Sequence, residues 1–316
     1  MIGLALRRLT AMIPVLVLTS VVVFSLIHLA PGDPVDVIVG QDRPSPEVIA
    51  AIRHDMGFDE PLPVQYLIWA QHVLQGDFGY SYRPRQPVMQ VVGARLPETI
   101  ELALMSTMLG LIIAFPLGLA AALNRGRWPD AAATVLSAIG ASMPAFWLGV
   151  LLIYLLALRF RWVPPSGYAS FGESPVDNLR SMVLPVLTLS FGYAAVMMRF
   201  FRTSLLDNLA LDFVRTARAK GLGPRAVIQT HVLRNALIPI FTVLGMETGR
   251  LLGGAVLTET IFALPGLGRL AVDSVLSRDF PTMQAAVTLM ALAVLGSTLI
   301  VDVLCGVVDP RMRTES

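Results

Sequence analysis

Cysteine, lysine and histidine are the residues that this sequence almost lacks. It contains one cysteine, Cys305, one lysine, Lys220, and four histidines. A single cysteine excludes an intrachain disulfide. The histidines also lack the close spacing of metal-binding motifs such as H-E-x-x-H, so we expect no metal site in the chain. They are His28, His54, His72 and His231.

The single lysine excludes a nucleotide-binding P-loop. That motif, G-x-x-x-x-G-K-[ST], needs glycine before its lysine and a hydroxyl residue after it, because its backbone N–H groups and lysine together hold the phosphates. Here Ala219 precedes Lys220 and Gly221 follows it. The nucleophile motif G-x-S-x-G is absent, and Cys305 lies in an apolar run where a packing role is expected. We therefore expect no catalytic residue and no cofactor in this chain, which is not predicted to be an enzyme.

Charged residues are scarce as well. They make up 15% of the 316 residues, against 55% hydrophobic residues and a mean hydropathy of +0.68. A soluble domain does not need so much apolar surface, whereas a bilayer core about 30 Å thick needs roughly 20 apolar residues in each helix that crosses it. The sequence therefore predicts an all-α membrane protein with six transmembrane helices. We place them near residues 9–30, 99–123, 131–158, 182–201, 237–258 and 284–308.

Arginine sets the expected orientation, because basic residues collect in short cytoplasmic segments. The first apolar run has no obvious small-residue cleavage site, so we interpret it as a retained span rather than a secretory signal. With the N-terminus inside, every predicted cytoplasmic segment is basic, and both termini are expected to be cytoplasmic. A net charge of +2 indicates no nucleic-acid partner. The basic residues of these segments are Arg7 and Arg8, Arg125 and Arg127, the cluster from Arg202 to Arg234, and Arg311 and Arg313.

The chain is expected to have four parts. In the second part, Ser45 and Pro46 have the form of an N-cap and a first helical residue, which indicates a small ordered extracytoplasmic cap. Its excess of acidic over basic residues would suit a basic patch on a docking protein. A further outer loop is expected at 259–281, where Pro265 and its neighbouring glycines interrupt the apolar pattern. The parts are a first helix (1–30), an extracytoplasmic segment (31–94), a five-helix block (95–305) and a cytoplasmic tail (306–316).

A long polar stretch, "DFVRTARAKGLGPRAVIQTHVLRNALIP", interrupts the hydrocarbon-rich second half. Residues 212–220 favour a helix, with Asp212 as a possible N-cap and Gly221 as the residue that stops it. Gly223 and Pro224 suit the N-cap and first position of a second helix. In that helix Ile228, Val232 and Ala236 would share one face. The sequence thus predicts a helix, a tight turn and a helix.

This hairpin would present an apolar knob, Phe213 and Val214, among the positive charges of Arg215, Arg218 and Lys220. Such a surface suits docking into a groove of another protein. The alternative is a solvated loop whose arginines only obey the topology rule or touch anionic lipid.

The hairpin resembles a known motif. Its halves "RTARAKGL" and "HVLRNALIP" are similar to the cytoplasmic EAA loop of type I permease subunits in ATP-binding cassette importers, in the version found in dipeptide and oligopeptide permeases. Of the general pattern (E-A-A, three residues, G, nine residues, I-x-L-P) only Ala217, Gly221 and Leu233 match. The resemblance nevertheless covers essentially the whole chain, through "LIHLAPGDPV", "PLPVQY", "GDFGYSY", "ETIFALPGLGRL", "SRDFP" and "VVDPRMR".

The resemblance implies a subunit of a larger assembly in the bacterial cytoplasmic (inner) membrane. Two permease subunits, expected to differ from each other, would each place the loop between spans four and five (202–236) in a cleft of a cytoplasmic ATPase. Two ATPase subunits would bind the ATP and Mg²⁺, and an extracytoplasmic binding protein would deliver the substrate. The residues that the resemblance assigns to the ATPase contact are Asp212, Phe213, Arg215, Thr216, Ala217, Lys220 and Gly221.

The expected substrates are dipeptides or oligopeptides. Similar permeases also serve importers for nickel complexes, glutathione, opines and some sugars, and the residues leave these alternatives open. From other classes, a self-contained secondary transporter would usually have more spans, often internally repeated. A membrane-embedded signalling or scaffold protein would use the hairpin without any effect on ATP turnover.

Glu247 and Arg250 fall near the middle of the fifth predicted span. An unpaired charge at that depth costs at least about 2.5 kcal/mol, but residues at i and i+3 of a helix can pair with each other. One interpretation is an internal ion pair or an anchor to the second subunit. The other is that they line the substrate cavity and hold the terminal amine or carboxylate of a peptide. Glycines nearby are expected to allow close helix packing: Gly245, Gly249, Gly253 and Gly254.

Overall fold

The computed structural model describes residues 2–29, 46–55 and 57–308, and these residues form helices and connecting turns with no β-strand. Parts of the "LIHLAPGDPV" stretch, of the extracytoplasmic segment and of the C-terminal tail, including the expected N-cap Ser45, lie outside the described residues. The helices are α1 (Ile2–Leu29), α3 (Pro46–Asp55), α4 (Leu62–Leu74), α5 (Val88–Gly93), α6 (Leu96–Leu123), α7 (Trp128–Ser142), α8 (Ala145–Leu152), α9 (Pro175–Leu209), α10 (Asp212–Ala219), α11 (Pro224–Val227), α12 (Leu233–Ile261), α13 (Leu267–Leu276) and α14 (Phe280–Val308), with π-helical turns at Ile153–Arg159 and Ile228–Val232.

Five helical stretches of the described chain are long and apolar enough to cross a membrane, and a sixth is counted if the bent pair α7 and α8 forms one broken span. The apolar runs seen in the sequence therefore become helices, as expected. The third run does not form one continuous helix. It breaks between α7 and α8, which are bent by 101°, because Met143 is extended (φ −82°, ψ 121°) just before Pro144. A residue before proline is disfavoured in the α region, so the break follows local sterics.

The fifth run also differs from its predicted limits. We expected Glu259 to begin an outer loop, but α12 continues to Ile261 and Glu259 is a buried helical residue. The turn starts only after Phe262, where Ala263 has φ +55°.

The chain divides into two compact units, which cut across the four parts expected from the sequence. Unit 1 holds residues 98–264, together with the first and last parts of the chain up to Leu9 and from Val294. Unit 2 holds residues 10–97 and 265–293.

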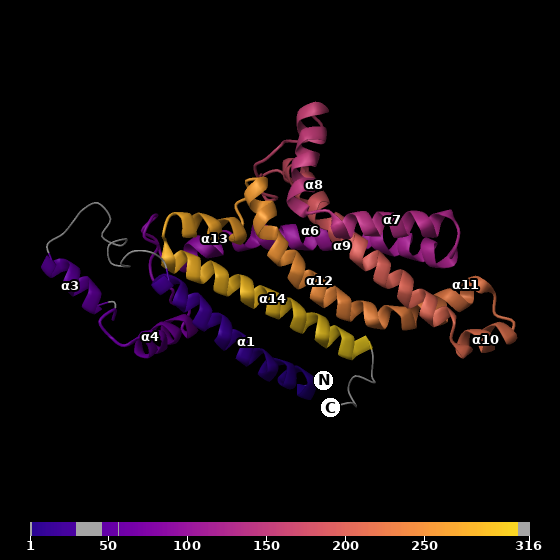
Figure 1. Cartoon of the computed structure of the whole chain (residues 1–316), viewed down its shortest axis with the longest axis horizontal. Helices are drawn as coiled ribbons and strands as arrows, with labels where there is room; N and C mark the ends of the chain where they lie inside the picture. Colours follow the sequence, from indigo (N-terminus) through magenta and orange to yellow (C-terminus); the bar gives the residue numbers. More distant parts are fainter. Residues whose placement is uncertain (1, 30–45, 56, 309–316) are drawn as a thin grey trace. The chain divides into compact units, whose positions relative to one another are not determined.

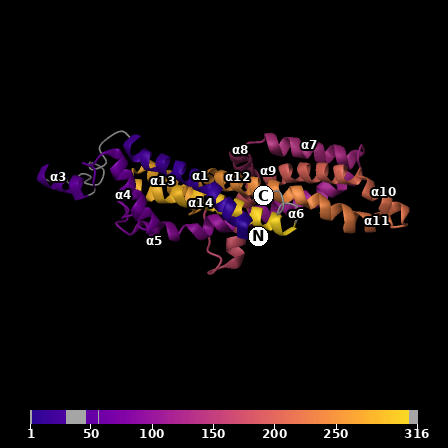
Figure 2. The same cartoon turned by 90° about the horizontal axis from the view of Figure 1, so that it is seen from below.

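Helix α9 is the centre of unit 1, and it packs against α7, α8 and α12. Figure 2 shows α7 running alongside α9. Small residues make these approaches close: a Cβ added to Gly140 of α7 would lie 2.6 Å from the Cβ of Ala195 in α9. In α6 and α9, Phe115 and Phe201 meet edge to face with ring centroids 4.8 Å apart. Interfaces of this kind are expected in lipid, where close van der Waals packing replaces the hydrophobic effect between helices.

An ion pair connects α7 and α9. The Arg202 Nε donates to Asp130 Oδ1 at 2.5 Å and its Nη2 donates to Asp130 Oδ2 at 2.9 Å. The same carboxylate accepts the Gly126 N–H at 2.9 Å, which fixes the turn before α7. Asp130 therefore holds the start of α7 on α9 through a two-pronged contact.

In unit 2, the buried carboxylate of Asp279 is the meeting point of two distant stretches. Oδ2 of Asp279 accepts hydrogen bonds from the hydroxyls of Ser81 and Thr282, and Oδ1 accepts the Tyr82 N–H at 3.2 Å. The stretches "GDFGYSY" and "SRDFP", recognised separately in the sequence, thus contact each other. Nearby, burial and the negative charge of Asp279 raise the pKa of the Tyr82 hydroxyl.

Candidate functional site

The polar stretch of the second half forms the predicted hairpin, located where α9 ends and α12 begins (Figure 1). Helix α10 is followed by Lys220 as C-cap, and Gly221 has φ +83°. A left-handed residue after a helix favours glycine, so the expected stop at Gly221 is confirmed. The expected N-cap is wrong by one position: Leu211 is the N-cap and Asp212 is the first helical residue.

Helix α10 has a clear outer face. Asp212, Arg215, Thr216, Lys220 and Gly221 are exposed, and Arg215 lies 3.4 Å from Asp212. An acidic residue in the first turn and basic residues in the last turn both suit the helix dipole.

The predicted apolar knob of Phe213 and Val214 is only partly right, because Val214 belongs to the buried inner face of α10. Val214 is only 1% exposed and Ala217 is buried as well, whereas Phe213 is half-buried. Since Val214 is buried, Phe213 is the member of the predicted knob that stays partly accessible.

The second arm begins as predicted, with Gly223 as N-cap and Pro224 in the first turn of α11. A π-helical turn, Ile228–Val232, then joins α11 to α12 without a break. Val227, Val232 and Ala236 are buried, whereas Ile228 is only half-buried, because the wider turn changes the register of the expected face. The second arm of the hairpin therefore continues directly into a long apolar helix, whereas the turn at Lys220–Gly223 separates α10 from it.

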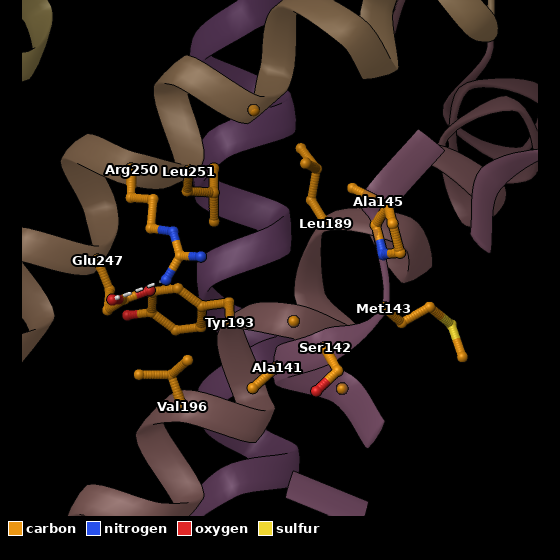
Figure 3. Close-up of a pocket in the computed structure, with 14 residues that line it drawn as sticks. Ala141, Ser142, Met143, Ala145, Leu189, Tyr193, Val196, Glu247, Arg250 and Leu251 are labelled. Atoms are coloured by element: carbon orange, nitrogen blue, oxygen red, sulfur yellow. Dashed lines mark ion pairs between the residues drawn. The ribbon is translucent and has the colours of Figure 1, made fainter. Parts of the chain in front are cut away.

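A cavity of about 290 Å³ lies in unit 1 (Figure 3). It is lined by the break between α7 and α8, by α9, and by α12. At the break its wall is formed by Gly140, Ala141, Ser142, Met143, Pro144 and Ala145. This volume is at the small end of the roughly 300–1,000 Å³ found for small-molecule pockets.

The two charges singled out in the fifth span both line this cavity. Arg250 Nη1 lies 3.6 Å from Glu247 Oε1, with the Arg250 side chain 71% exposed and that of Glu247 14% exposed. The sequence therefore predicted the pair correctly. Both residues also line this cavity, so pairing and lining do not exclude each other; that the cavity takes a peptide stays a prediction.

Tyr193 contributes a third polar group from α9. It is 4% exposed, and its hydroxyl makes no hydrogen bond of standard geometry in the described chain, although Thr248 lies near enough to interact electrostatically. The Thr248 hydroxyl donates to the carbonyl of Leu244 at 2.7 Å. Figure 3 shows the Tyr193 ring beside the Glu247–Arg250 pair.

Helix α12 also exposes one continuous stripe, which we call the α12 stripe. Its members recur every three or four residues, the spacing of a single helix face. Met246 and Leu257 are exposed large hydrophobic residues, and Arg250 lies between them. The α12 stripe comprises Thr242, Met246, Arg250, Gly253, Leu257 and Thr260.

One of the four predicted glycines of α12 lies in the α12 stripe, and the other three lie where the helix packs against its neighbours. A Cβ on Gly245 would lie 3.1 Å from Val301, and one on Gly249 would lie 3.1 Å from Val294. One on Gly254 would meet Leu189 at 3.5 Å, but Gly253 has no neighbour within 4 Å. Close packing is thus confirmed for three of the four predicted glycines.

Sequence reasoning missed two long-range polar contacts of unit 1, one buried and one partly buried. The Thr99 hydroxyl donates to Glu259 Oε1 at 2.7 Å, and the Tyr168 hydroxyl donates to Glu101 Oε2 at 2.8 Å. Burial and the hydrogen bond to Glu101 raise the pKa of Tyr168. The partners are 160 and 67 residues apart, so no local pattern could have revealed them.

Comparison with known families places the chain among membrane transport proteins. Residues 114–314 match the model of the binding-protein-dependent transport system inner membrane component, and residues 1–103 match its N-terminal companion. The chain is 42% identical over 313 residues to the glutathione transport system permease protein GsiC of Salmonella typhimurium, covering 99% of each chain. It is 41% identical over 308 residues to a probable peptide ABC transporter permease protein of Sinorhizobium fredii, covering 98% of each.

Two solved structures share the fold. An inward-facing conformation of the MetNI methionine ABC transporter aligns with a TM-score of 0.57 at 18% identity, covering 70% of this chain and 97% of the other. An amino acid ABC transporter with histidines aligns with a TM-score of 0.53 at 17% identity, covering 68% and 93%. At these identities the likeness concerns the fold.

Proposed function

Because the chain belongs to the family of binding-protein-dependent transport system inner membrane components, we propose that it forms one half of a translocation pathway for small peptides. Proteins of this family are multi-pass inner-membrane permease subunits of ABC importers, and they are not enzymes. They work with a second permease, ATPases and a binding protein. The proposal concerns the kind of cargo, the surfaces that meet these partners and the orientation of the chain.

The α12 stripe is the observation that carries the pathway. Arg250 is exposed near the middle of an apolar helix, in a stripe whose other members are apolar or small. An unpaired arginine facing lipid at that depth costs at least about 2.5 kcal/mol, and the ion pair with Glu247 offsets only part of this cost, because the Arg250 side chain is 71% exposed. This cost is avoided if the α12 stripe faces a second permease across a polar translocation pathway instead of facing lipid. A second permease of different sequence could supply negative charges opposite Arg250.

The names of the relatives support the cargo. One is called a glutathione permease and another a peptide permease, and both glutathione and short peptides carry an amide backbone with charged groups at its ends. Dipeptides or oligopeptides, glutathione included, are therefore the proposed substrates. Importers for nickel complexes, opines or sugars are the alternative cargoes within the same family.

The outer face of α10 is the proposed contact with the ATPase. It combines accessible charges with a half-buried aromatic ring, which suits insertion into a groove. Its basic residues favour the cytoplasmic side, so both chain termini would be cytoplasmic as well. ATP and Mg²⁺ would be bound by the two partner ATPases. This chain would contribute Asp212, Phe213, Arg215, Thr216, Lys220 and Gly221 to the contact, and Ala217, buried on the inner face, would support them from behind.

A pair of glycines in the hairpin allows a matched test. Gly221 has φ +83°, whereas Gly223 has φ −65°, and among the described residues neither has a neighbour within 4 Å of an added Cβ. Valine at Gly221 should therefore distort the turn, since the left-handed conformation costs a β-branched residue roughly 1–2 kcal/mol, while valine at Gly223 should be accepted.

The measurement is purification of the tagged chain from its native membrane, with assay of the ATPase activity that accompanies it and of peptide import. We expect wild type and Gly223→Val to bring down active ATPases, and Gly221→Val to lose them or to hydrolyse ATP without import. Equal coupling in all three proteins would remove the role given to α10. Absence of any ATPase from wild type would remove the assembly itself.

A further inference from the structure

The cavity between the α7–α8 break, α9 and α12 holds a positive and a negative group side by side. The two are contributed by Arg250 and Glu247, 3.6 Å apart. The inference drawn from this geometry rests on the proposed function, because it concerns which peptides the cavity accepts.

Each charge of the pair could exchange its present partner for a charged group of a ligand. Arg250 is largely exposed, so its guanidinium can turn toward a ligand, while Glu247 is mostly covered by protein. With no ligand, each group neutralises the other, which lowers the cost of keeping two charges inside a membrane helix. A ligand that brings one ammonium and one carboxylate to the same place keeps the sum of charges at zero, so exchange of partners leaves no charge unpaired.

Tyr193 indicates that the cavity is built for a polar occupant. Its hydroxyl is buried, and among the described residues it makes no hydrogen bond of standard geometry, although the Thr248 hydroxyl is close. A buried polar group that is poorly satisfied is costly. The ring lies beside the charge pair (Figure 3). A ligand N–H or carboxylate oxygen placed there would satisfy the hydroxyl.

The closeness of the two charges selects among peptides. An ordinary peptide carries its amine and its terminal carboxylate at opposite ends of the chain. A glutamyl residue linked through its γ-carboxyl group keeps both its ammonium and its α-carboxylate on one carbon atom. The second kind presents two opposite charges on one carbon atom, as close together as the side-chain charges of Glu247 and Arg250, whereas an α-linked glutamyl residue holds its side-chain carboxylate two methylene groups away from the carbon that bears the ammonium.

We propose that this cavity holds the free amino-acid head group of a γ-glutamyl peptide, with its carboxylate on Arg250, its ammonium on Glu247 and a hydrogen bond to Tyr193. The cavity is then a specificity site of the membrane subunit, additional to any selection by the binding protein. Its volume accommodates the head group, and the remainder of the peptide lies outside it along the α12 stripe.

The test uses two isomers with the same atoms and the same net charge, γ-Glu-Ala and α-Glu-Ala, both radiolabelled. Import is measured into vesicles that hold the complete importer, purified through a tag on this chain and reconstituted with its own binding protein. The readout is the ratio of γ-Glu-Ala to α-Glu-Ala import, compared between variants. Because the binding protein is the same in each sample, a change in this ratio originates in the permease.

The informative variants are Glu247→Gln, Arg250→Gln and Tyr193→Phe, which preserve side-chain size. Arg180→Gln is the matched control, because Arg180 is an exposed residue of α9 that does not line the cavity. We expect the two charge variants to lower the ratio about tenfold, Tyr193→Phe to lower it about threefold, and Arg180→Gln to leave it unchanged. Basal ATPase activity of each complex reports assembly, and the double variant Glu247→Gln/Arg250→Gln, with no unpaired charge, replaces any single variant that fails to assemble.

The possible results distinguish a failure of the head-group site from a failure of the proposed peptide import. If all variants import both isomers in the wild-type ratio, the head-group site is wrong and peptide import stands. The same conclusion holds if the wild-type protein imports α-Glu-Ala alone. If wild type imports neither isomer, the peptide function and the head-group site fall together.

Discussion

Asp130 is the residue through which the start of α7 is held on α9. Its carboxylate takes both prongs of Arg202 and the N–H of Gly126, and its side chain is only 10% exposed. An uncompensated charge in such a place is more damaging than the loss of both partners, because the remaining ion keeps its desolvation cost.

We therefore expect Asp130→Asn to destabilise the protein by about 2 kcal/mol, less than the full range for buried pairs because Arg202 is partly exposed. The double variant Asp130→Asn/Arg202→Gln should recover part of this loss. Thermal unfolding in detergent measures both. Additive effects of the two substitutions would show that the pair contributes no coupling energy.

Individual residues also show which contacts could be predicted from the sequence and which could not. The Glu247–Arg250 pair was predictable because both members lie one helical turn apart. Glu259 was not, because its partner Thr99 belongs to another helix and because a Pro-Gly sequence just beyond it indicated a loop. Ala217 shows the same limit: its place in a motif was visible, but its burial depends on how the hairpin folds back on itself.

At the scale of helices, close packing of α7 on α9 depends on Gly140. A side chain there would bring a Cβ to 2.6 Å from the Cβ of Ala195, an atom that cannot rotate away. Gly140→Ala should therefore separate the two helices and cost about 1–3 kcal/mol, as overpacking does.

Gly296→Ala in α14 is the control, because an added Cβ has no neighbour there within 4 Å. Thermal unfolding of the two variants beside wild type gives the comparison. Equal midpoints for Gly140→Ala and Gly296→Ala would mean that α7 and α9 tolerate a wider separation than the structure has.

The helices themselves were predictable from composition, since hydrocarbon requires long apolar runs whatever the neighbours. The break within the third run was not. Pro14, Pro116, Pro185 and Pro239 all lie inside continuous helices, whereas Pro144 follows an extended residue and separates α7 from α8. Whether a proline interrupts a membrane helix depends on which neighbours satisfy the freed carbonyl, and that is a tertiary property. The cavity was missed for this reason, because the break forms one of its walls.

At the scale of the whole molecule, a chain with an exposed arginine near the middle of a span is not suited to be alone in the membrane. We expect the chain expressed without its second permease to be short-lived. The double variant Glu247→Leu/Arg250→Leu should lengthen its half-life, because it removes an insertion cost of at least about 2.5 kcal/mol. In the complete importer the same variant should abolish import of γ-Glu-Ala.

Pulse-chase labelling of the lone chain measures the half-life, with Arg180→Leu as a control for the loss of an exposed arginine outside the α12 stripe. An unchanged half-life of the double variant would mean that lipid already accommodates Arg250, and the need for a covering subunit would lose its main support.

The carboxylate of Asp279 has a consequence for the time course of synthesis. Ser81 donates to a residue 198 positions further along the chain, and ribosomes add about 5–20 residues each second. Roughly 10–40 s therefore pass between the synthesis of Ser81 and that of its acceptor, at the rates given above. During that interval the turn around Ser81 and Tyr82 is already made but cannot close. A nascent chain stalled before residue 279 should thus remain open to proteases at this turn. Folding of unit 2 should be one of the last steps in the synthesis and folding of the protein.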